Sequence, residues 1–277
     1  MTRELHGFGV GLRRSFADAL LETVRPPDFI ELTPENWAFF GGRRRQMLEA
    51  NAERFPSTSH SVSLSIGGLE PLDAPLIDSL AQLVRRHRMT FFSDHLCYSS
   101  VAGSPVHDLL PLPFTAEVVE HVARRVAEAQ ERVEAPLALE NATFYSHMPG
   151  AQMDEATFLG AVLERSGCRL LLDVNNVYVN SLNHHFEPRA FIDRMPLDRV
   201  VEIHVAGHTA MDGVVIDTHI GPIIDPVWDL YRYTIARAGR PIPTLVEWDQ
   251  EIPELDGVLD EVDRARAHSA RALGEPP

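Results

Sequence analysis

Cysteine is scarce in this 277-residue chain, which has only Cys97 and Cys168, far apart and without a CxxC pair. A disulfide framework is therefore not expected. Cys97 is most simply interpreted as a small buried hydrophobic side chain. With so little sulfur, a metal site in this chain would rely on nitrogen and oxygen ligands.

Long apolar runs are lacking as well. No stretch approaches the ~20 apolar residues needed to cross a bilayer. The opening segment, MTRELHGFGV, also lacks the basic and then apolar order of a signal peptide. We therefore expect a cytoplasmic protein with no membrane partner.

Positive charge is in short supply. The chain has 25 Lys and Arg against 40 Asp and Glu, a formal net charge of -15. Binding to a phosphate backbone depends on clustered cations, so we expect no nucleic-acid partner. The basic run Arg43, Arg44 and Arg45 is interpreted as the solvated face of a helix.

The chain does have a repeated order of short apolar runs and longer amphipathic stretches, which is typical of βα units around a parallel sheet. Eight strands are expected, at residues 8–12, 29–33, 57–66, 90–96, 137–141, 169–175, 200–207 and 243–248. Helices are expected at residues 15–24, 74–88, 114–133, 154–167, 226–239 and 253–273.

Eight such units close most naturally into a single (β/α)8 TIM barrel, expected to span residues 1–277 as one domain. A doubly wound open sheet is the competing fold, but it usually carries a Gly-rich phosphate loop after its first strand. The segment FGVGLRRSF has two glycines there and lacks the third.

Polar side chains mark the ends of the later strands, where the chemistry of such barrels is found. They are His60, His95, Glu140, Asn141, Asp173, Asn175, Asn176, His204, Asp217, His219 and Glu247. Carboxylates that converge on a buried mouth need compensating positive charge, which bound cations supply. Imidazole mixed with carboxylate suits iron, manganese or zinc at a catalytic site rather than a structural zinc.

Each of these residues alone has a simpler interpretation. A lone strand histidine such as His60 or His204 is more often hydrogen-bonded in the core, and Glu140 or Glu247 alone would more often be a solvated strand end. Recurrence across six consecutive strand ends favours a metal cluster instead. Four further histidines lack such support, namely His107, His184, His185 and His208.

The spacing of the polar residues resembles the trinuclear metal pattern of the endonuclease IV and xylose isomerase-like barrels. Local motifs are more specific. In order, they are ELTPENW, HSVSLSIGG, SDHLCYSS, HDLLPLPFT, LALEN, LLLDVNNVYVNSLNHH, EIHVAGH, DTHIGPI and LVEWD. Together they resemble the multinuclear non-heme iron-dependent oxidases over roughly residues 6–265, which would form the core of the barrel.

The resemblance implies a set of ligands. Glu140 would bridge two irons, one completed by His60 and His95 and the other by Asp173, His204 and Glu247. A third metal would take Asp217, His219 and Asn176. The endonuclease pattern would place a histidine at position 176, so the asparagine, a weaker ligand, puts endonuclease chemistry in doubt.

The resemblance also implies roles. The catalytic residues would be Glu140, Asp173, His204 and Glu247. From the residues themselves, a rim loop after the sixth strand is expected to contact substrate through Asn180, Asn183, His184 and His185, and Asn141 is a further candidate. Glu35 and Asn36 are interpreted as a helix start and its cap, with a place in the substrate pocket as the alternative.

Members of this family use two or three irons, in mixed Fe(II) and Fe(III) states, with O2 as co-substrate. They modify cysteine residues of a ribosomally made precursor peptide, usually with a partner protein that presents the peptide. The resemblance implies the same cofactors and partners here.

Two other functions stay open on the residues alone. One is a zinc- or manganese-dependent hydrolase or sugar isomerase on the same barrel. The other is a metal-binding or peptide-presenting protein without turnover. Metal analysis of the purified protein separates the first from an iron oxidase, and oxygen consumption with peptide present separates the second.

Overall fold

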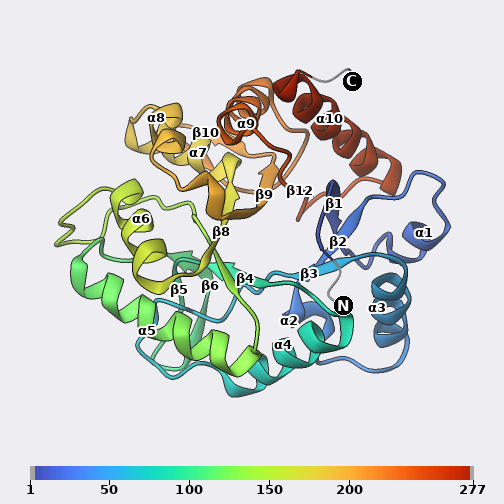
Figure 1. Cartoon of the computed structure of the whole chain (residues 1–277), viewed down its shortest axis with the longest axis horizontal. Helices are drawn as coiled ribbons and strands as arrows, with labels where there is room; N and C mark the ends of the chain where they lie inside the picture. The colour runs from blue at the N-terminus through green and yellow to red at the C-terminus, as the bar shows by residue number, and fades with distance from the viewer. Residues whose placement is uncertain (1–3, 275–277) are drawn as a thin grey trace.

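A closed parallel barrel forms the centre of the computed structural model, which describes residues 4–274 (Figure 1). Its eight strands are β1 Phe8–Gly11, β2 Phe29–Leu32, β3 Ser57–Ser59, β4 Phe92–His95, β7 Leu137–Glu140, β8 Arg169–Asp173, β9 Val200–Ala206 and β12 Thr244–Glu247. They follow the order β3-β2-β1-β12-β9-β8-β7-β4. A parallel bridge between His60 and Ser93 joins the two end strands and closes the barrel. The TIM-barrel prediction is confirmed, and the open-sheet alternative is wrong.

Helices surround this barrel on the outside (Figure 1). They are α1 Ala17–Glu22, α2 Pro34–Trp37, α3 Gly42–Arg54, α4 Ala74–His87, α5 Ala116–Val133, α6 Glu155–Ser166, α7 Val174–His184, α8 Pro188–Asp193, α9 Asp225–Ala238 and α10 Leu255–Leu273, with a 3-10 turn, η1, at Leu197–Arg199. Asp73, Thr115 and Asp154 cap α4, α5 and α6 through their side-chain oxygens. Such caps satisfy backbone N–H groups that the first turn leaves open.

An apolar layer fills the barrel interior below its carboxyl end. Its buried members are Leu5, Phe29, Phe91, Ala138, Leu171 and Leu245. Side chains two residues apart on a strand point to the same face. Phe29, Ala138, Leu171 and Leu245 therefore lie directly below Glu31, Glu140, Asp173 and Glu247. An apolar layer thus lies directly beneath the polar residues at the mouth of the barrel.

The third strand is shorter than residues 57–66. It ends at Ser59, because the chain then turns across the barrel mouth. Asp94 accepts the backbone N–H of Leu64 at 2.8 Å, and Ser65 has a φ of 53°, outside the extended region. Pairing with a strand neighbour therefore stops just after His60.

Two antiparallel hairpins stand outside the barrel and were not expected from the sequence. β5 Tyr98–Val101 pairs with β6 Ser104–Leu110, and β10 Thr209–Met211 pairs with β11 Val214–Ile216. Both hairpins follow barrel strands, so they lie at the end of the barrel where the polar residues gather.

Both cysteines are buried and free, as the sequence predicts. Within residues 4–274, no helix combines the length and the apolar character that a membrane span requires.

Candidate metal centre

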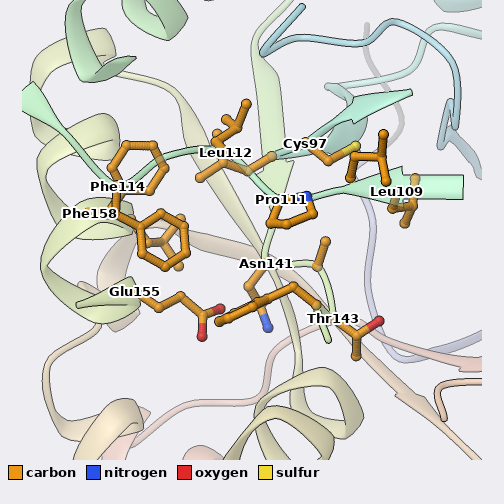
Figure 2. Close-up of a pocket in the computed structure, with 14 residues that line it drawn as sticks. Cys97, Leu109, Pro111, Leu112, Phe114, Asn141, Thr143, Glu155 and Phe158 are labelled. Atoms are coloured by element: carbon orange, nitrogen blue, oxygen red, sulfur yellow. The ribbon is translucent and has the colours of Figure 1, made fainter. Parts of the chain in front are cut away.

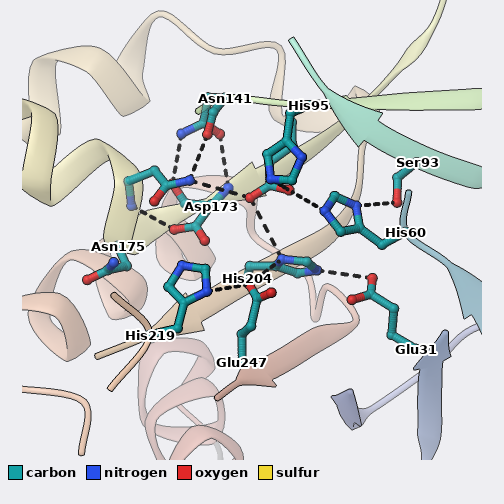
Figure 3. A network of polar contacts seen from close by, with 12 residues as sticks. Glu31, His60, Ser93, His95, Asn141, Asp173, Asn175, His204, His219 and Glu247 are labelled. Carbon is teal, nitrogen blue, oxygen red and sulfur yellow. Dashed lines mark hydrogen bonds and ion pairs between the residues drawn. The ribbon is translucent and has the colours of Figure 1, made fainter. Parts of the chain in front are cut away.

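Six of the predicted ligands are buried together at the carboxyl ends of the barrel strands (Figure 3). They are His60, His95, Glu140, Asp173, His204 and Glu247. Strands β4, β7, β8, β9 and β12 each contribute one, and His60 directly follows β3. Parallel strands bring these sequence-distant side chains to one edge, as expected for a barrel active site.

Glu140 lies at the centre of this group and is 1% exposed. Its Oε2 is 3.2 Å from Nε2 of His60 and 3.4 Å from Nε2 of His95. Its Oε1 lies 3.8 Å from Nδ1 of His204. Imidazole nitrogens therefore face both oxygens of one carboxylate, which is the arrangement that a bridging ligand requires.

A second group of ligand atoms continues from His204. Nδ1 of His204 lies 3.1 Å from Oε2 of Glu247. Glu140, Asp173 and His204 each offer one ligand atom within 4.8 Å of the others, and so do Asp173, His219 and Glu247. Neighbouring metal positions would therefore share ligands.

The residues present fit metal ions, because several buried ligand atoms have no hydrogen-bond partner. These atoms are Glu140 Oε2, Asp173 Oδ2, Asn176 Oδ1, His204 Nδ1 and His219 Nε2. An unpaired buried polar atom costs about 1–3 kcal/mol. Three of these atoms face another predicted ligand without a hydrogen bond: Glu140 Oε2 faces His60 at 3.2 Å, His204 Nδ1 faces Glu247 at 3.1 Å, and His219 Nε2 faces Asp217 at 2.8 Å. Cations bound among these ligands would account for all five atoms.

The pKa values of the buried ligands differ strongly from those of free side chains. Burial raises the pKa of Glu140 well above its usual range and that of Asp173 to about 7. Burial lowers the pKa of His95 to about 4. For His204, burial acts to lower the pKa, but the facing carboxylates, Glu31 first, raise it well above its usual value. Metal ions bound here would replace protons.

Asp217 and His219 lie on residues 217–223, a segment between β11 and α9 that we call the arm. Nε2 of His219 is 2.8 Å from Oδ1 of Asp217, and Nδ1 is 2.9 Å from Oδ2 of Asp249. Asn175 donates to Oδ1 of Asp217 at 2.8 Å, and Thr143 donates to Oδ2 at 3.3 Å. The arm thus brings both predicted ligands to the edge of the cluster.

Asn176 is the remaining predicted ligand of a third metal. Its side-chain NH2 donates to the carbonyl of Asn141 at 3.0 Å and to Oε1 of Glu140 at 3.4 Å. Its Oδ1 has no partner and is buried. The amide NH2 therefore faces Glu140, and the ligand role of the oxygen stays a prediction.

The segment after Asp173 is a helix, α7, and the prediction of a longer strand followed by a rim loop was wrong. Asp173 accepts the N–H of Asn176 at 2.7 Å and so caps the first turn. Val174 and Val177 are fully or almost fully buried, so packing of this face stabilises the helix. His185 ends it in the left-handed conformation, with a φ of 58°.

Polar atoms on α7 bind the protein itself. Oδ1 of Asn180 accepts the N–H of Phe144 at 3.1 Å, and Nε2 of His184 is 2.8 Å from the carbonyl of Phe144. Asn183 forms a hydrogen bond to each backbone polar group of Val215, at 2.8 and 2.9 Å. These contacts pin neighbouring loops, so a substrate role for these residues rests on prediction alone.

Three further predicted substrate residues lie around the mouth. Oε1 of Glu35 accepts hydrogen bonds from Ser61 at 2.6 Å and from the N–H of Val62 at 3.0 Å. Asn36, beside it on α2, is exposed. Asn141 forms two 2.9 Å hydrogen bonds to the backbone of Asp173 and lines a small pocket beside the centre (Figure 2).

Sequence reasoning missed two buried glutamates, Glu31 beside the cluster and Glu202 below it. Oε2 of Glu31 lies 3.3 Å from Nε2 of His204, the ring nitrogen turned away from Glu140. Glu202 is fully buried, and neither carboxylate oxygen has a partner. The sequence did contain a signal, because Glu31 and Glu202 lie inside the apolar strand segments FIEL and VVEIHVA. Acidic side chains are almost never fully buried unless they are paired, so a glutamate in such a strand indicates a partner or a bound cation.

Comparison with known proteins identifies the family. Residues 7–270 match the family described as "RiPP precursor modification enzyme MbnB/TglH/ChrH". The chain belongs to this family. The MbnB/TglH/ChrH enzymes modify ribosomally synthesised precursor peptides, so the chain is identified as an enzyme of that class, with a precursor peptide as its substrate.

Bacterial UPF0276 proteins are similar to this chain over most of its length. The UPF0276 protein of Shewanella amazonensis is 43% identical over 267 residues, covering 96% of this chain and 95% of the relative. A UPF0276 protein of Acinetobacter baylyi is 46% identical over 251 residues, covering 90% and 86%. One from Neisseria meningitidis serogroup B is 42% identical over 268 residues, covering 95% of both.

Solved structures confirm the xylose isomerase-like barrel. Endonuclease IV from Thermus thermophilus superposes with a TM-score of 0.64 at 15% identity, covering 96% of this chain and 99% of the other. A D-tagatose 3-epimerase-like protein gives a TM-score of 0.67 at 11% identity, covering 97% and 98%. At such low identity these likenesses show the fold alone.

Proposed function

We propose that the chain is a multinuclear non-heme iron, O2-dependent oxidase that modifies cysteine residues of its precursor peptide. The observation that carries this proposal is the buried Glu140 carboxylate, with imidazole nitrogens facing both of its oxygens. Such a carboxylate can hold two metals at once. Family membership indicates that the substrate is a precursor peptide. The imidazole and carboxylate ligands fit a redox-active metal such as iron.

The donor set fits iron, as it fits manganese or catalytic zinc, and the resemblance to the iron-dependent oxidases favours iron. Imidazole and carboxylate ligands together are typical of non-heme iron sites with open positions, whereas structural zinc usually takes thiolates. Cys97 is 1% exposed, and burial raises the pKa of its thiol well above the usual value. It is therefore an inert core residue, and a reacting sulfur would come from the substrate.

The predicted ligands divide into three sets, one for each proposed metal, and two of the sets share Glu140. His60, His95 and Glu140 would hold one iron, and Glu140, Asp173, His204 and Glu247 would hold a second. Asp217, His219 and Asn176 would hold a third. Iron in these positions supplies one-electron chemistry with O2 and binds a substrate thiol as its thiolate.

The residues around the ligands fix their orientation and exclude water. Ser93 Oγ lies 2.9 Å from Nδ1 of His60, and Glu31 faces Nε2 of His204 at 3.3 Å. Contacts of this kind fix the ring and its tautomer, so that the other nitrogen is free to bind metal. The apolar layer below, which includes Leu171 and Leu245, keeps this end of the site dry.

A direct test combines oxygen consumption with mass spectrometry of the peptide. The neighbouring genes are first searched for a short cysteine-bearing reading frame and a partner-protein gene, and the anaerobically iron-loaded protein is mixed with the products of both. On admission of O2, we expect oxygen uptake and a mass change located on cysteine. The peptide with serine in place of cysteine should remain unchanged, because a hydroxyl group is far less acidic than a thiol.

Two outcomes would count against the proposal. Turnover by zinc- or manganese-loaded protein without O2 would indicate a hydrolase or isomerase. Return of the cysteine peptide unchanged from iron-replete protein with its partner present would indicate a binding protein. Glu140→Ala serves as the inactive control, since it removes the shared carboxylate.

A further inference from the structure

The predicted metal-binding histidines differ in how the protein holds them. Those on the barrel wall, such as His60 and His204, are positioned by strands and by the partners described above. His219 lies instead on the arm, outside any helix or strand. Its orientation must come from other contacts.

The backbone of His219 is in a conformation that is unfavourable for a residue with a side chain. Its φ is 49°, in the left-handed region that residues other than glycine rarely adopt. Such a conformation persists where surrounding structure enforces it. The backbone N–H of Asp249 donates to the carbonyl of His219 at 3.2 Å, which fixes the arm at this point.

The side chain of Asp249 provides the second constraint. Its Oδ2 lies 2.9 Å from Nδ1 of His219, whereas Oε2 of Glu247 is farther from the same nitrogen, at 3.5 Å. Nε2 of His219 makes no hydrogen bond of good geometry, and it lies 2.8 Å from Oδ1 of Asp217, the other arm ligand predicted for the third metal. The ring therefore has one nitrogen held by Asp249 and the other turned toward the predicted metal position.

Arg13 holds Asp249 in turn. Its guanidinium forms an ion pair with Oδ1 of Asp249, and its Nε donates to the carbonyl of Trp248 at 3.1 Å. Arg13 follows β1 and Asp249 follows β12, which are neighbours in the barrel. The side chain of Arg13 is 17% exposed. The chain of contacts from Arg13 to Asp249 to His219 is thus anchored on the barrel wall.

We propose that Asp249, anchored by Arg13, is a positioning residue that aims Nε2 of His219 at the third metal. It thereby sets the affinity of that site separately from the pair centred on Glu140. This inference rests on the proposed function in so far as it requires a metal at His219. It adds two residues, Arg13 and Asp249, to the site.

The physical reason is the state of the imidazole ring. A carboxylate that accepts the Nδ1–H of His219 fixes the tautomer with Nε2 unprotonated and makes that nitrogen a better donor. Loss of such a partner typically lowers metal affinity roughly 10–100-fold. Asp249→Asn keeps an oxygen that can accept the hydrogen bond but loses the charge that attracts Arg13, so its effect should be smaller than that of Asp249→Ala.

The test is an anaerobic Fe(II) titration of the full chain after chelation, with bound iron measured per chain. Asp249→Ala should weaken only the last iron to bind, by roughly 10–100-fold, and Asp249→Asn and Arg13→Ala should weaken it less. The matched control is Asp212→Ala, an exposed aspartate at the turn between β10 and β11. It should bind iron like the unaltered protein.

Hydrogen exchange of the metal-free proteins gives a second measurement that does not depend on iron. Residues 217–223 should exchange faster in Asp249→Ala and Arg13→Ala than in Asp212→Ala. Unchanged affinity for the last iron in Asp249→Ala, or equal loss of all irons, would overturn the proposal. If the unaltered chain binds no iron at all, the proposed function fails. The exchange measurement still tests the anchor in that case, because unchanged exchange of residues 217–223 in both variants would refute the roles of Arg13 and Asp249.

Discussion

A single buried carboxylate, that of Glu140, connects most of the ligand atoms in the centre. It is 1% exposed and faces imidazole nitrogens on both oxygens. Without Glu140, His60 would lose the carboxylate that faces it, and His204 would lose one of the carboxylates that face it. The residue-scale consequence is that loss of this side chain should affect more than one metal.

We expect Glu140→Ala to lose at least two irons per chain. Removal of a shared ligand leaves both metals short of charge and of coordination. Iron content is measured after anaerobic reconstitution, beside a thermal unfolding curve that checks the fold. Full iron content in this variant would contradict the bridging assignment.

Asp217→Ala combined with His219→Ala should behave differently and lose about one metal. These side chains lie on the arm, and the ligands around Glu140 come from the barrel strands. The same measurement of iron content applies. Loss of all metal would show that the sites are not separable.

Glu140 and Asp173 could be predicted because each ends an apolar strand segment, following LAL and LLL. His60 and His95 follow the largely polar segments STS and FSD, so their prediction depended on the recurrence of polar residues across the strand ends. The contacts that orient the ligands could not be predicted. Asp249 reaches His219 only through the fold of the arm, and the left-handed backbone of His219 has no signal in the sequence.

At the scale of elements, the end of β9 and the arm are in close backbone contact. A Cβ atom on Gly207 would lie 2.4 Å from the carbonyl oxygen of Ile220 and 2.5 Å from that of Gly221. Contacts this short with backbone atoms cannot be relieved by rotation of a side chain. Gly207 is thus required for space.

Gly207→Ala should therefore displace the arm and weaken the third metal, with a loss of stability of about 1–3 kcal/mol. Iron content and denaturant unfolding check both effects. The matched control is Gly160→Ala in α6, where a Cβ would meet nothing within 4 Å. That change should leave iron binding unaltered, and a similar loss of iron in both variants would contradict the packing argument.

A buried carboxyl group joins α6 to α7. Glu155 is half-buried as a residue and lines the small pocket beside Asn141 (Figure 2), and Nδ2 of Asn180 lies 3.3 Å from each of its carboxylate oxygens. Burial raises the pKa of Glu155 to about 8. The folded protein therefore holds a proton there at neutral pH that the unfolded chain releases.

The sign of the pH dependence follows from this difference. Between the ordinary glutamate pKa and about 8, the folded state binds more protons, so this group lowers stability as pH rises. Glu155→Gln removes the effect and keeps an acceptor for Asn180. We expect the variant to gain about 1–3 kcal/mol relative to the unaltered protein between pH 5 and pH 8. Urea unfolding at both pH values measures this, and an equal difference at both would contradict it.

The eight barrel strands were predictable because their apolar runs are separated by strongly amphipathic stretches. α7 was not. Its sequence, VNNVYVNSLNH, is rich in asparagine and β-branched residues that disfavour helices in isolation. The cap at Asp173 and burial of the valines stabilise the helix there, and both depend on tertiary structure.

At the scale of the whole molecule, the centre combines an excess of acid with burial. The chain carries a net charge of -15, and Glu31, Glu140, Asp173 and Glu202 are among the buried acids at the mouth and beneath it. Burial raises the pKa of all four. The folded barrel thus takes up protons or cations that the unfolded chain does not need.

Metal removal should therefore change the pH dependence of stability. In the metal-free protein, burial raises the pKa of Asp173 to about 7, so the stability that goes with its bound proton is lost as pH rises from the ordinary aspartate pKa to about 7. His204 and His219 act in the same direction, because their raised pKa values stabilise the fold only while they stay protonated. His95, with a pKa of about 4, acts oppositely below the ordinary histidine pKa.

Bound metal reverses this trend, because the ligands must lose their protons to bind and metal affinity rises with pH. The stabilisation by metal grows with affinity at a fixed concentration of free metal. We therefore expect the difference in unfolding temperature between Fe(II)-loaded and metal-free protein to increase from pH 6 to pH 8 under anaerobic conditions. Glu140→Ala should show a smaller difference at every pH. A difference that stays constant or shrinks with rising pH would mean that the buried carboxyl and imidazole groups are not the ligands.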